Sequence, residues 1–157
     1  MELPHSKLGT REYWDEFYNT EIRNFSENPE DTGECWFDDC GAEDRMVQYV
    51  ESELAPGFDE STKILDLGTG NGHLLFSLRE SEVPGQFLGI DYSHTSVKFA
   101  SKIAKSNPDL EDIQFKAVDF ISDPKWNGAE QFDLVLDKGT LDAIALSTIP
   151  NAPQKYV

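Results

Sequence analysis

The sequence predicts an α/β fold built on a doubly wound, mostly parallel sheet, with a helical extension at its N-terminus. After residue 61, short apolar runs of strand type alternate with amphipathic helical patterns, which is typical of parallel strands joined by crossover helices. The stretch ILDLGTGNGHLLFSL has three glycines at every second position between two such segments, as a tight strand-to-helix turn requires. With 157 residues, of which 38% are hydrophobic, the chain can bury one ordinary core.

The first 60 residues are expected to form an acidic helical extension. Aromatic side chains recur at three- and four-residue steps, which predicts a helix over residues 10–24. An acidic loop follows, and apolar residues over 46–54 indicate a second helix that a Pro-Gly pair ends. The change of pattern near residue 61 divides the chain into this extension, residues 1–60, and a ligand-binding part, residues 61–157.

The second part is expected to contain about four strands. The apolar runs place these strands at 63–67, 86–90, 113–118 and 132–137. The helical patterns fall at 74–78, 94–106 and 140–147. Ser93 is the expected N-cap of the middle helix, which Asn107 and Pro108 end. Because ligands of such sheets bind beyond the carboxyl ends of the strands, the polar residues that end each strand are candidate site residues.

The charge of the chain restricts its partners. The formal net charge is −17, and the first 60 residues hold 17 acidic against 4 basic side chains. Such a field repels nucleic acids and anionic membranes, and it attracts a basic protein or a cationic ligand. The same charge also fits a surface that only aids solubility, so both interpretations stay open. Without a membrane-spanning apolar stretch or a secretory signal, we expect a soluble, cytoplasmic protein of undetermined oligomeric state.

The cysteines and the large aromatic residues of the extension have ordinary interpretations. Cys35 and Cys40 lack a second pair of ligands, so we expect reduced thiols and no metal site. His73 lies just inside a predicted helix and is interpreted as a surface or packing residue. Trp14 and Trp36 either close over a ligand or pack the extension onto the sheet.

The glycine turn and the acids beside it predict the class of ligand. Glycines at 68, 70 and 72 remove Cβ atoms where a ligand lies against the main chain, although a simple tight turn has the same need. Asp91 ends the second strand, where a carboxylate can accept hydrogen bonds from both hydroxyls of a ribose. The sequence therefore predicts an adenosine derivative.

This adenosine derivative is expected to carry no phosphate. Dinucleotide-binding turns have their third glycine one place later, where this chain has His73, and no Gly-Lys-Ser/Thr follows as in a P-loop. Asp66 also puts a negative charge beside the position of a pyrophosphate. S-adenosyl-L-methionine, which has a sulfonium and an ammonium group, is therefore the expected cofactor. A nicotinamide-dependent oxidoreductase is a weaker alternative, because the glycine spacing opposes it.

Four motifs, LDLGTGNG, GIDYS, AVDF and FDLVLDKGTLDAI, occur in an order and spacing that resemble the Rossmann-like class I S-adenosylmethionine-dependent methyltransferases. The block LGTREYWDEFYNTEIRNFSENPEDTGECWFDD, followed by DKGTLDAI, more narrowly resembles the protein-lysine methyltransferases that modify translation elongation factor 1-alpha. The resemblance covers nearly the whole chain. It implies a protein-lysine methyltransferase with that basic protein as its substrate.

The resemblance also implies which residues hold the cofactor. Gly68 and Gly70 would admit the methionine part, Asp66 would orient its ammonium group, and Asp91 would bind the ribose. The complete set of expected cofactor-binding residues is Asp66, Gly68, Thr69, Gly70, Asn71, Gly72, Asp91, Tyr92, Asp119 and Phe120.

Two further acids have implied roles near the reacting groups. Asp119 would accept from the adenine amino group, with Tyr92 and Phe120 packed near the ring. Asp137 would position the incoming amine rather than act as a general base. Both acids also fit helix-capping or turn positions. Amino methyltransferases that act on nucleobases or glutamine often carry Asn/Asp-Pro-Pro-Tyr at the position of Asp137, so we do not expect that chemistry.

The family implies seven strands, whereas this sequence shows about four. We therefore expect an incomplete domain with an exposed edge at its fourth strand. A non-catalytic S-adenosylmethionine-binding or protein-interaction module, left by truncation, is the alternative to an active enzyme.

Overall fold

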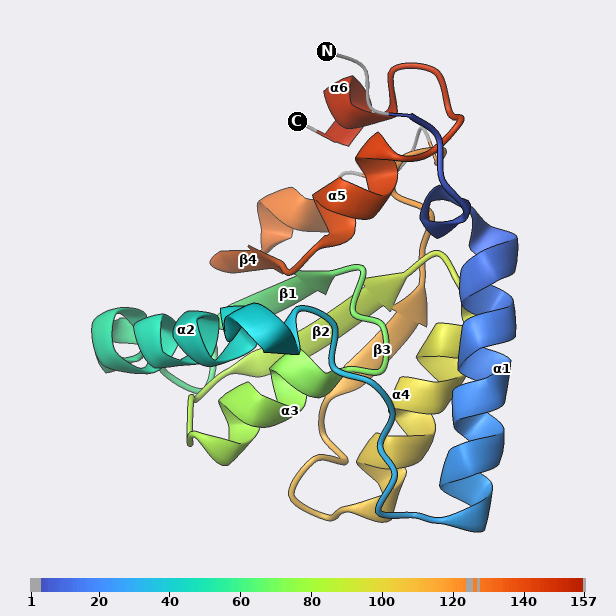
Figure 1. Cartoon of the computed structure of the whole chain (residues 1–157). Helices are drawn as coiled ribbons and strands as arrows, with labels where there is room; N and C mark the ends of the chain where they lie inside the picture. Colours follow the sequence, from blue (N-terminus) through green and yellow to red (C-terminus); the bar gives the residue numbers. More distant parts are fainter. Residues whose placement is uncertain (1–3, 124–125, 127, 157) are drawn as a thin grey trace.

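The computed structural model describes residues 4–123, 126 and 128–156, and it confirms the predicted α/β fold (Figure 1). Four parallel strands form one sheet in the order β3-β2-β1-β4. The strands are β1 (Lys63–Leu67), β2 (Gln86–Asp91), β3 (Gln114–Ala117) and β4 (Leu134–Asp137). Each lies within two residues of its predicted position.

The central strands are nearly continuous apolar runs because both of their faces are covered. Ile64 and Leu65 in β1 and Ile90 in β2 are each 0% exposed. The outer strand β4 pairs only with β1 among the described residues, and its Val135 is 39% exposed. The expected exposed edge at the fourth strand is therefore present in the described part of the chain.

Six α-helices and several short helical turns accompany the sheet in the described residues. The α-helices are α1 (Arg11–Glu27), α2 (Ala42–Tyr49), α3 (His73–Glu80), α4 (His94–Ser106), α5 (Thr140–Ala145) and α6 (Ala152–Tyr156). The short turns are η1 (Lys7–Gly9), η2 (Asp38–Cys40), η3 (Val50–Leu54), η4 (Ala55–Gly57) and η5 (Gly128–Gln131). The second predicted helix begins earlier than expected, at Ala42, and continues through η3 and η4 to the predicted Pro-Gly end.

Side-chain caps explain where two of these helices begin. Thr10 accepts a hydrogen bond from the Tyr13 backbone N–H at the start of α1. Ser93 accepts one from the Ser96 backbone N–H at 3.1 Å, which confirms the predicted N-cap of α4. In both helices the cap satisfies a backbone donor that has no partner within the helix.

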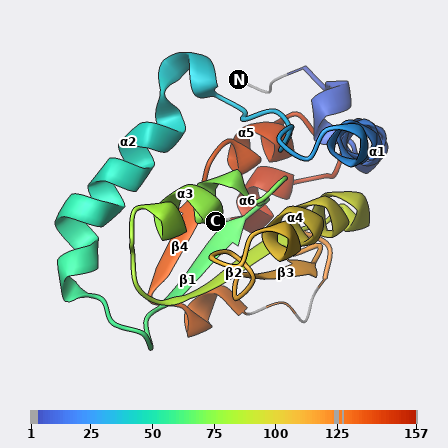
Figure 2. The same ribbon diagram turned by 90° about the horizontal axis from the view of Figure 1, so that it is seen from below.

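The extension belongs to the same core as the sheet. Helices α2, α3 and α4 lie along one face of the sheet (Figure 2), and α1 packs on the outer side of α4 (Figure 1). Tyr18 and Phe25 of α1 are buried, and their ring centroids lie 6.4 and 5.9 Å from that of Phe99 in α4. The aromatic periodicity of α1 is therefore a packing face for the sheet domain.

The chain reverses its direction of winding after β3. It passes through η5 and returns as β4 on the other side of β1, which creates a crevice at the carboxyl ends of β1 and β4. The first described residues return to this end of the molecule, since the Ser6 backbone N–H donates to the Leu146 carbonyl at 3.1 Å. Within the described residues, the structure has no helix with the length and apolarity needed to span a membrane.

Candidate functional site

A cavity of about 420 Å³ opens at the carboxyl ends of the strands. This volume is within the range of small-molecule sites. All of the predicted cofactor-binding residues except Gly72 line it: Asp66, Gly68, Thr69, Gly70, Asn71, Asp91, Tyr92, Asp119 and Phe120. The structure therefore brings the ends of β1, β2 and β3 together around one space, as a parallel sheet dictates.

Asp91 joins the glycine turn to helix α4. One carboxylate oxygen accepts from the Gly70 backbone N–H at 3.1 Å, and the other accepts from the Ser93 backbone N–H at 2.9 Å. The side chain is buried, and burial raises its pKa against the lowering effect of these hydrogen bonds. Each oxygen keeps a second lone pair, so the carboxylate can still accept from a ligand in the cavity.

The glycine turn depends on the absence of a side chain at Gly70. Its φ of +57° favours glycine, and a Cβ at this position would lie 2.6 Å from the Tyr18 hydroxyl oxygen. Gly72 serves a different purpose, because a Cβ there would meet Phe76 and Phe115 in the core. Helix α1 therefore approaches the main chain closely at Gly70, which also lines the cavity.

Asp66 is a buried acid with a perturbed pKa. Burial, followed by repulsion from Asp137 and Asp91, raises its pKa to about 7, while the charge of Lys138 acts in the opposite direction. The side chain is 3% exposed and lines the cavity. A cationic group that entered beside it would favour the ionised carboxylate.

Arg11 binds two residues expected at the adenine ring. Its guanidinium donates to Asp119 at 2.8 Å and lies over the Tyr92 ring, 5.1 Å from the centroid. Asp119 also accepts from the Ser122 backbone N–H at 3.0 Å, which is the turn role considered from sequence. The extension therefore holds this corner of the cavity through the first residue of α1.

Asp137 faces helix α5 and is not among the described residues that line the cavity. Its carboxylate accepts from the Thr140 and Leu141 backbone N–H groups at 2.8 and 3.1 Å, and from the Tyr156 hydroxyl. These contacts fit the helix-capping alternative. Lys138, which follows Asp137 in this segment, does line the cavity.

The extension supplies a wall of the cavity. Its aromatic residues Trp14, Tyr18, Trp36 and Phe37 belong to the lining, and the Trp14 and Trp36 ring centroids are 5.1 Å apart. The Trp36 Nε1 atom is buried and has no hydrogen-bond partner in the described structure. An unpaired buried donor costs stability, so this indole can donate to a ligand without giving up another bond.

The predicted site residue Asn71 fastens this wall to the glycine turn. Its side-chain amide donates to the carbonyls of Thr32 and Glu34, each at 3.1 Å. The acidic loop of the extension is thereby held directly over the start of α3.

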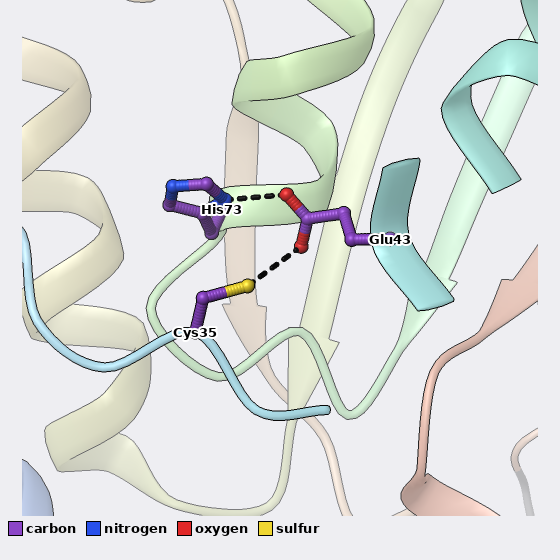
Figure 3. A group of neighbouring side chains, drawn as sticks. All are labelled: Cys35, Glu43 and His73. Carbon is purple, nitrogen blue, oxygen red and sulfur yellow. Dashed lines mark hydrogen bonds and ion pairs between the residues drawn. The ribbon is translucent and has the colours of Figure 1, made fainter. Parts of the chain in front are cut away.

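A second set of contacts near the cavity centres on Glu43 (Figure 3). Its carboxylate is 2.5 Å from His73 Nδ1 and accepts from the Cys35 thiol at 3.3 Å and the Ser77 hydroxyl at 2.8 Å. Lys138 Nζ lies 3.5 Å from the same carboxylate. His73 and Cys35, for which no partner was predicted, are thus tied together through an acid of helix α2.

The pKa values of this group are shifted in opposite directions. Burial raises the pKa of Glu43, but the hydrogen bond and charge of His73, with the bonds from Ser77 and Cys35, outweigh it and lower the pKa to about 2. The hydrogen bond to Glu43 raises the pKa of His73 despite its partial burial. Burial and the Glu43 charge raise the pKa of the Cys35 thiol to about 11, so the thiol stays protonated.

Comparison with known proteins identifies a family. A family model described as a methyltransferase domain matches residues 58–153. The protein-lysine N-methyltransferase EFM4 of Saccharomyces cerevisiae is 48% identical over 147 residues, which cover 93% of this chain and 63% of the yeast protein. EEF1A lysine methyltransferase 2 of Mus musculus is 38% identical over 143 residues, which cover 90% of this chain and 54% of the mouse protein. The chain therefore spans less than two thirds of the length of these relatives.

Solved structures show the same fold at low sequence identity. The [4+2]-cyclase SpnF matches with a TM-score of 0.62 and 20% identity, over 98% of this chain and 56% of that one. Magnesium protoporphyrin IX methyltransferase from Synechocystis PCC 6803 matches with a TM-score of 0.55 and 20% identity, over 87% of this chain and 62% of that one. Because one neighbour is a cyclase and the other a methyltransferase, these likenesses establish the architecture and leave the chemistry to the site.

Proposed function

Since the chain belongs to the methyltransferase domain family, we propose that it binds S-adenosyl-L-methionine and serves as a protein-lysine N-methyltransferase that acts on translation elongation factor 1-alpha. The observation that carries the proposal is the contact of Asp91 with the glycine turn beside a largely apolar cavity. The substrate is inferred from the names of the yeast and mouse relatives. We accordingly assign the reaction to the cytoplasm, where translation takes place.

The cavity suits the three parts of this cofactor. Asp91 would accept from the ribose hydroxyls, and Tyr92 and Phe120 would lie beside the adenine ring. Asp119 would accept from the adenine amino group with the lone pairs that Arg11 leaves free. Gly68 and Gly70, with Thr69, Asn71 and Gly72 shaping the turn, would bound the methionine part. When bound, the cofactor supplies a methyl group on a sulfonium, which is already activated for transfer to an amine.

The residues of the chain would align and desolvate the amine. A lysine has an ordinary pKa near 10.4 and must be neutral to attack, and an apolar wall such as Trp36 and Phe37 favours the neutral form. Asp137 would act by position, because it holds the first turn of α5. Thr140, which follows it, donates to the Leu67 carbonyl at 2.6 Å and so sets this turn against β1. Alignment in a dry crevice is the main requirement of an in-line transfer.

The charge of the extension supports a basic protein substrate. The acidic loop that Asn71 holds at the cavity is part of the segment with 17 acidic and 4 basic residues. Long-range attraction of this kind raises the rate of encounter with a positively charged protein and disfavours nucleic acids.

Two measurements on the 157-residue chain test the proposal. Calorimetry should detect binding of S-adenosylhomocysteine and none of NAD. Transfer of a radiolabelled methyl group to purified elongation factor 1-alpha should then depend on the chain and disappear in Asp91→Ala. Cofactor binding without transfer would favour the non-catalytic module, and preference for NAD would contradict the proposal.

A further inference from the structure

We propose that Lys138 binds the carboxylate of the amino-acid part of the cofactor, and that it does so opposite Asp66, which faces the ammonium group. This inference rests on the proposed function, because it assumes a ligand that carries a zwitterionic amino acid. It assigns a binding role to a residue that the sequence analysis did not select. The arguments come from the charge of the cavity, the strand register and the contacts of the Lys138 ammonium group.

The distribution of charge leaves one position for an anionic group. Among the described residues that line the cavity, Lys138 is the one lysine or arginine, and the other candidate cation, His73, is paired with Glu43. The acidic side chains of the lining are Glu34, Asp66, Asp91, Asp119 and Asp142. A ligand carboxylate placed near any of these acids would be repelled, whereas at Lys138 it would form a charge-assisted hydrogen bond.

The register of the sheet puts Lys138 beside the glycine turn. Leu67 of β1 is paired with Asp137 of β4 in the parallel ladder, so the residues that follow, Gly68 and Lys138, leave the sheet side by side. Asp66 lies one step earlier on β1, and its pKa responds to the charge of Lys138. An amino-acid group seated on the turn would therefore have an acid and an ammonium group within reach of its two charged ends.

The ammonium group of Lys138 is held in place by contacts that leave part of its hydrogen-bonding capacity for a ligand. It donates to the Trp36 carbonyl at 2.8 Å, lies 3.5 Å from Glu43, and its side chain is 13% exposed. The Glu43 carboxylate is shared with His73, Ser77 and Cys35. Because an ammonium group has three N–H donors, one remains for a ligand in the cavity.

A metal site is the competing interpretation of the same group. Cys35, Glu43 and His73 offer ligand atoms that all lie within 4.8 Å of one another (Figure 3). The ammonium group of Lys138 next to Glu43 opposes a divalent cation there, and the protonated thiol would have to lose its proton first. The contacts therefore favour Glu43 as the residue that holds Lys138 at the edge of the cavity.

Comparison of S-adenosyl-L-methionine with its decarboxylated form tests the inference, because the two ligands differ only in the carboxylate. Calorimetry on the whole chain should give a Kd about tenfold or more lower for the intact ligand, as expected from one charge-assisted hydrogen bond. In Lys138→Met this advantage should fall to one or below, because the acids that remain in the lining repel a carboxylate. Lys98→Met, an exposed lysine of α4, is the matched control and should leave the ratio unchanged.

The outcomes separate this inference from the proposed function. If both ligands bind the unmutated chain equally well, the carboxylate has no anchor and the inference is overturned without the need for a variant. An unchanged ratio in Lys138→Met, or in Lys138→Gln if the first variant does not fold, would also overturn it. Absence of binding by both ligands would instead contradict the proposed function.

Discussion

At the scale of single residues, the site depends on side chains that serve the fold and the ligand together. Asp91 binds two backbone N–H groups from different segments, Gly70 and Ser93, and still faces the cavity. A residue of this kind cannot be changed without effects on both stability and affinity.

Replacement of Asp91 by asparagine should lower both the stability of the fold and the affinity for the cofactor. The amide nitrogen cannot accept a hydrogen bond, so the Gly70 or the Ser93 N–H loses its partner, at a cost of about 1–3 kcal/mol in the free energy of unfolding. We expect the Kd for S-adenosylhomocysteine to rise by about tenfold or more. Urea denaturation and calorimetry measure the two effects. Asp109→Asn, at an exposed position, should change neither, and equal affinity in Asp91→Asn would refute the role of this acid.

Gly70→Ala should lower the free energy of unfolding more than an alanine substitution at another glycine with left-handed backbone. Gly41 has a similar φ, +61°, but no atom lies within 4 Å of the position of its Cβ. Both variants carry the backbone strain of about 1–3 kcal/mol, and only Gly70→Ala also meets the Tyr18 hydroxyl. Urea denaturation should therefore rank Gly70→Ala below Gly41→Ala in stability. Adding Tyr18→Phe should recover part of the difference, and no recovery would show that the hydroxyl is not the obstacle.

At the scale of elements, ion pairs and aromatic contacts fasten the extension to the sheet domain. Glu43 in α2 binds His73 in α3, and Arg11 in α1 binds Asp119 after β3. The Glu43–His73 pair contains two titratable groups, so its contribution to stability depends on pH.

The contribution of the Glu43–His73 pair to the free energy of unfolding should be greatest between about pH 4.5 and 6.5. The pKa of Glu43 is lowered from 4.5 to about 2, so its contribution is present above pH 4.5 and is lost as the pH falls toward 2. The pKa of His73 is raised from 6.5, so its contribution is complete below pH 6.5 and is lost as the pH rises through the raised value. The difference in unfolding free energy between the parent chain and His73→Gln should be largest in this window. His94→Gln, on the exposed surface of α4, should show no such maximum, and a flat difference for His73→Gln would contradict the assignment.

The elements were predictable where local pattern decides them. The glycine turn, the Ser93 cap and the buried runs of β1 and β2 follow from periodicity and from residue types a few positions apart. Helix α6 was missed because its five residues are too few for a periodic pattern. The start of α2 was also wrong, since Gly41 caps it with left-handed backbone and no side-chain hydrogen bond.

The site was predictable only in part, for a related reason. Asp91 and the glycines are near one another in sequence, and a general rule of parallel sheets brings the strand ends together. The contacts of Lys138 with Trp36, and of Arg11 with Asp119, join residues more than 100 positions apart. These contacts depend on how the extension packs, which no local signal encodes. The cofactor roles of the individual residues remain predictions.

At the scale of the whole molecule, the extension and the sheet domain are expected to unfold as one unit. Their aromatic residues share one buried cluster, so a cut at residue 61 would expose the face of α4 that Tyr18 and Phe25 cover. The boundary predicted near residue 61 thus separates two patterns of sequence. In the structure, residues before and after this boundary contribute to one core.

Unfolding of the two parts should be coincident. Tryptophan fluorescence reports mainly on the extension, which contains Trp14 and Trp36 of the three tryptophans, while far-ultraviolet circular dichroism reports on all helices and strands. We expect the same urea midpoint from both signals. An earlier fluorescence transition would show that the extension detaches first and would refute a single cooperative unit.

In the described part of the chain, β4 pairs with β1 alone, so its other edge makes the colloidal behaviour of the protein depend on charge. A strand edge with an exposed Val135 invites pairing between copies, and mutual repulsion at a net charge of −17 keeps the copies apart near neutral pH. Dynamic light scattering should detect growing particles as the pH approaches the isoelectric value of 4.3. Val135→Lys should suppress this growth, whereas Leu141→Lys, equally exposed at 39% but on α5, should not. The acidity of this chain therefore keeps its copies from pairing through the edge of β4, in addition to any attraction that it exerts on a partner.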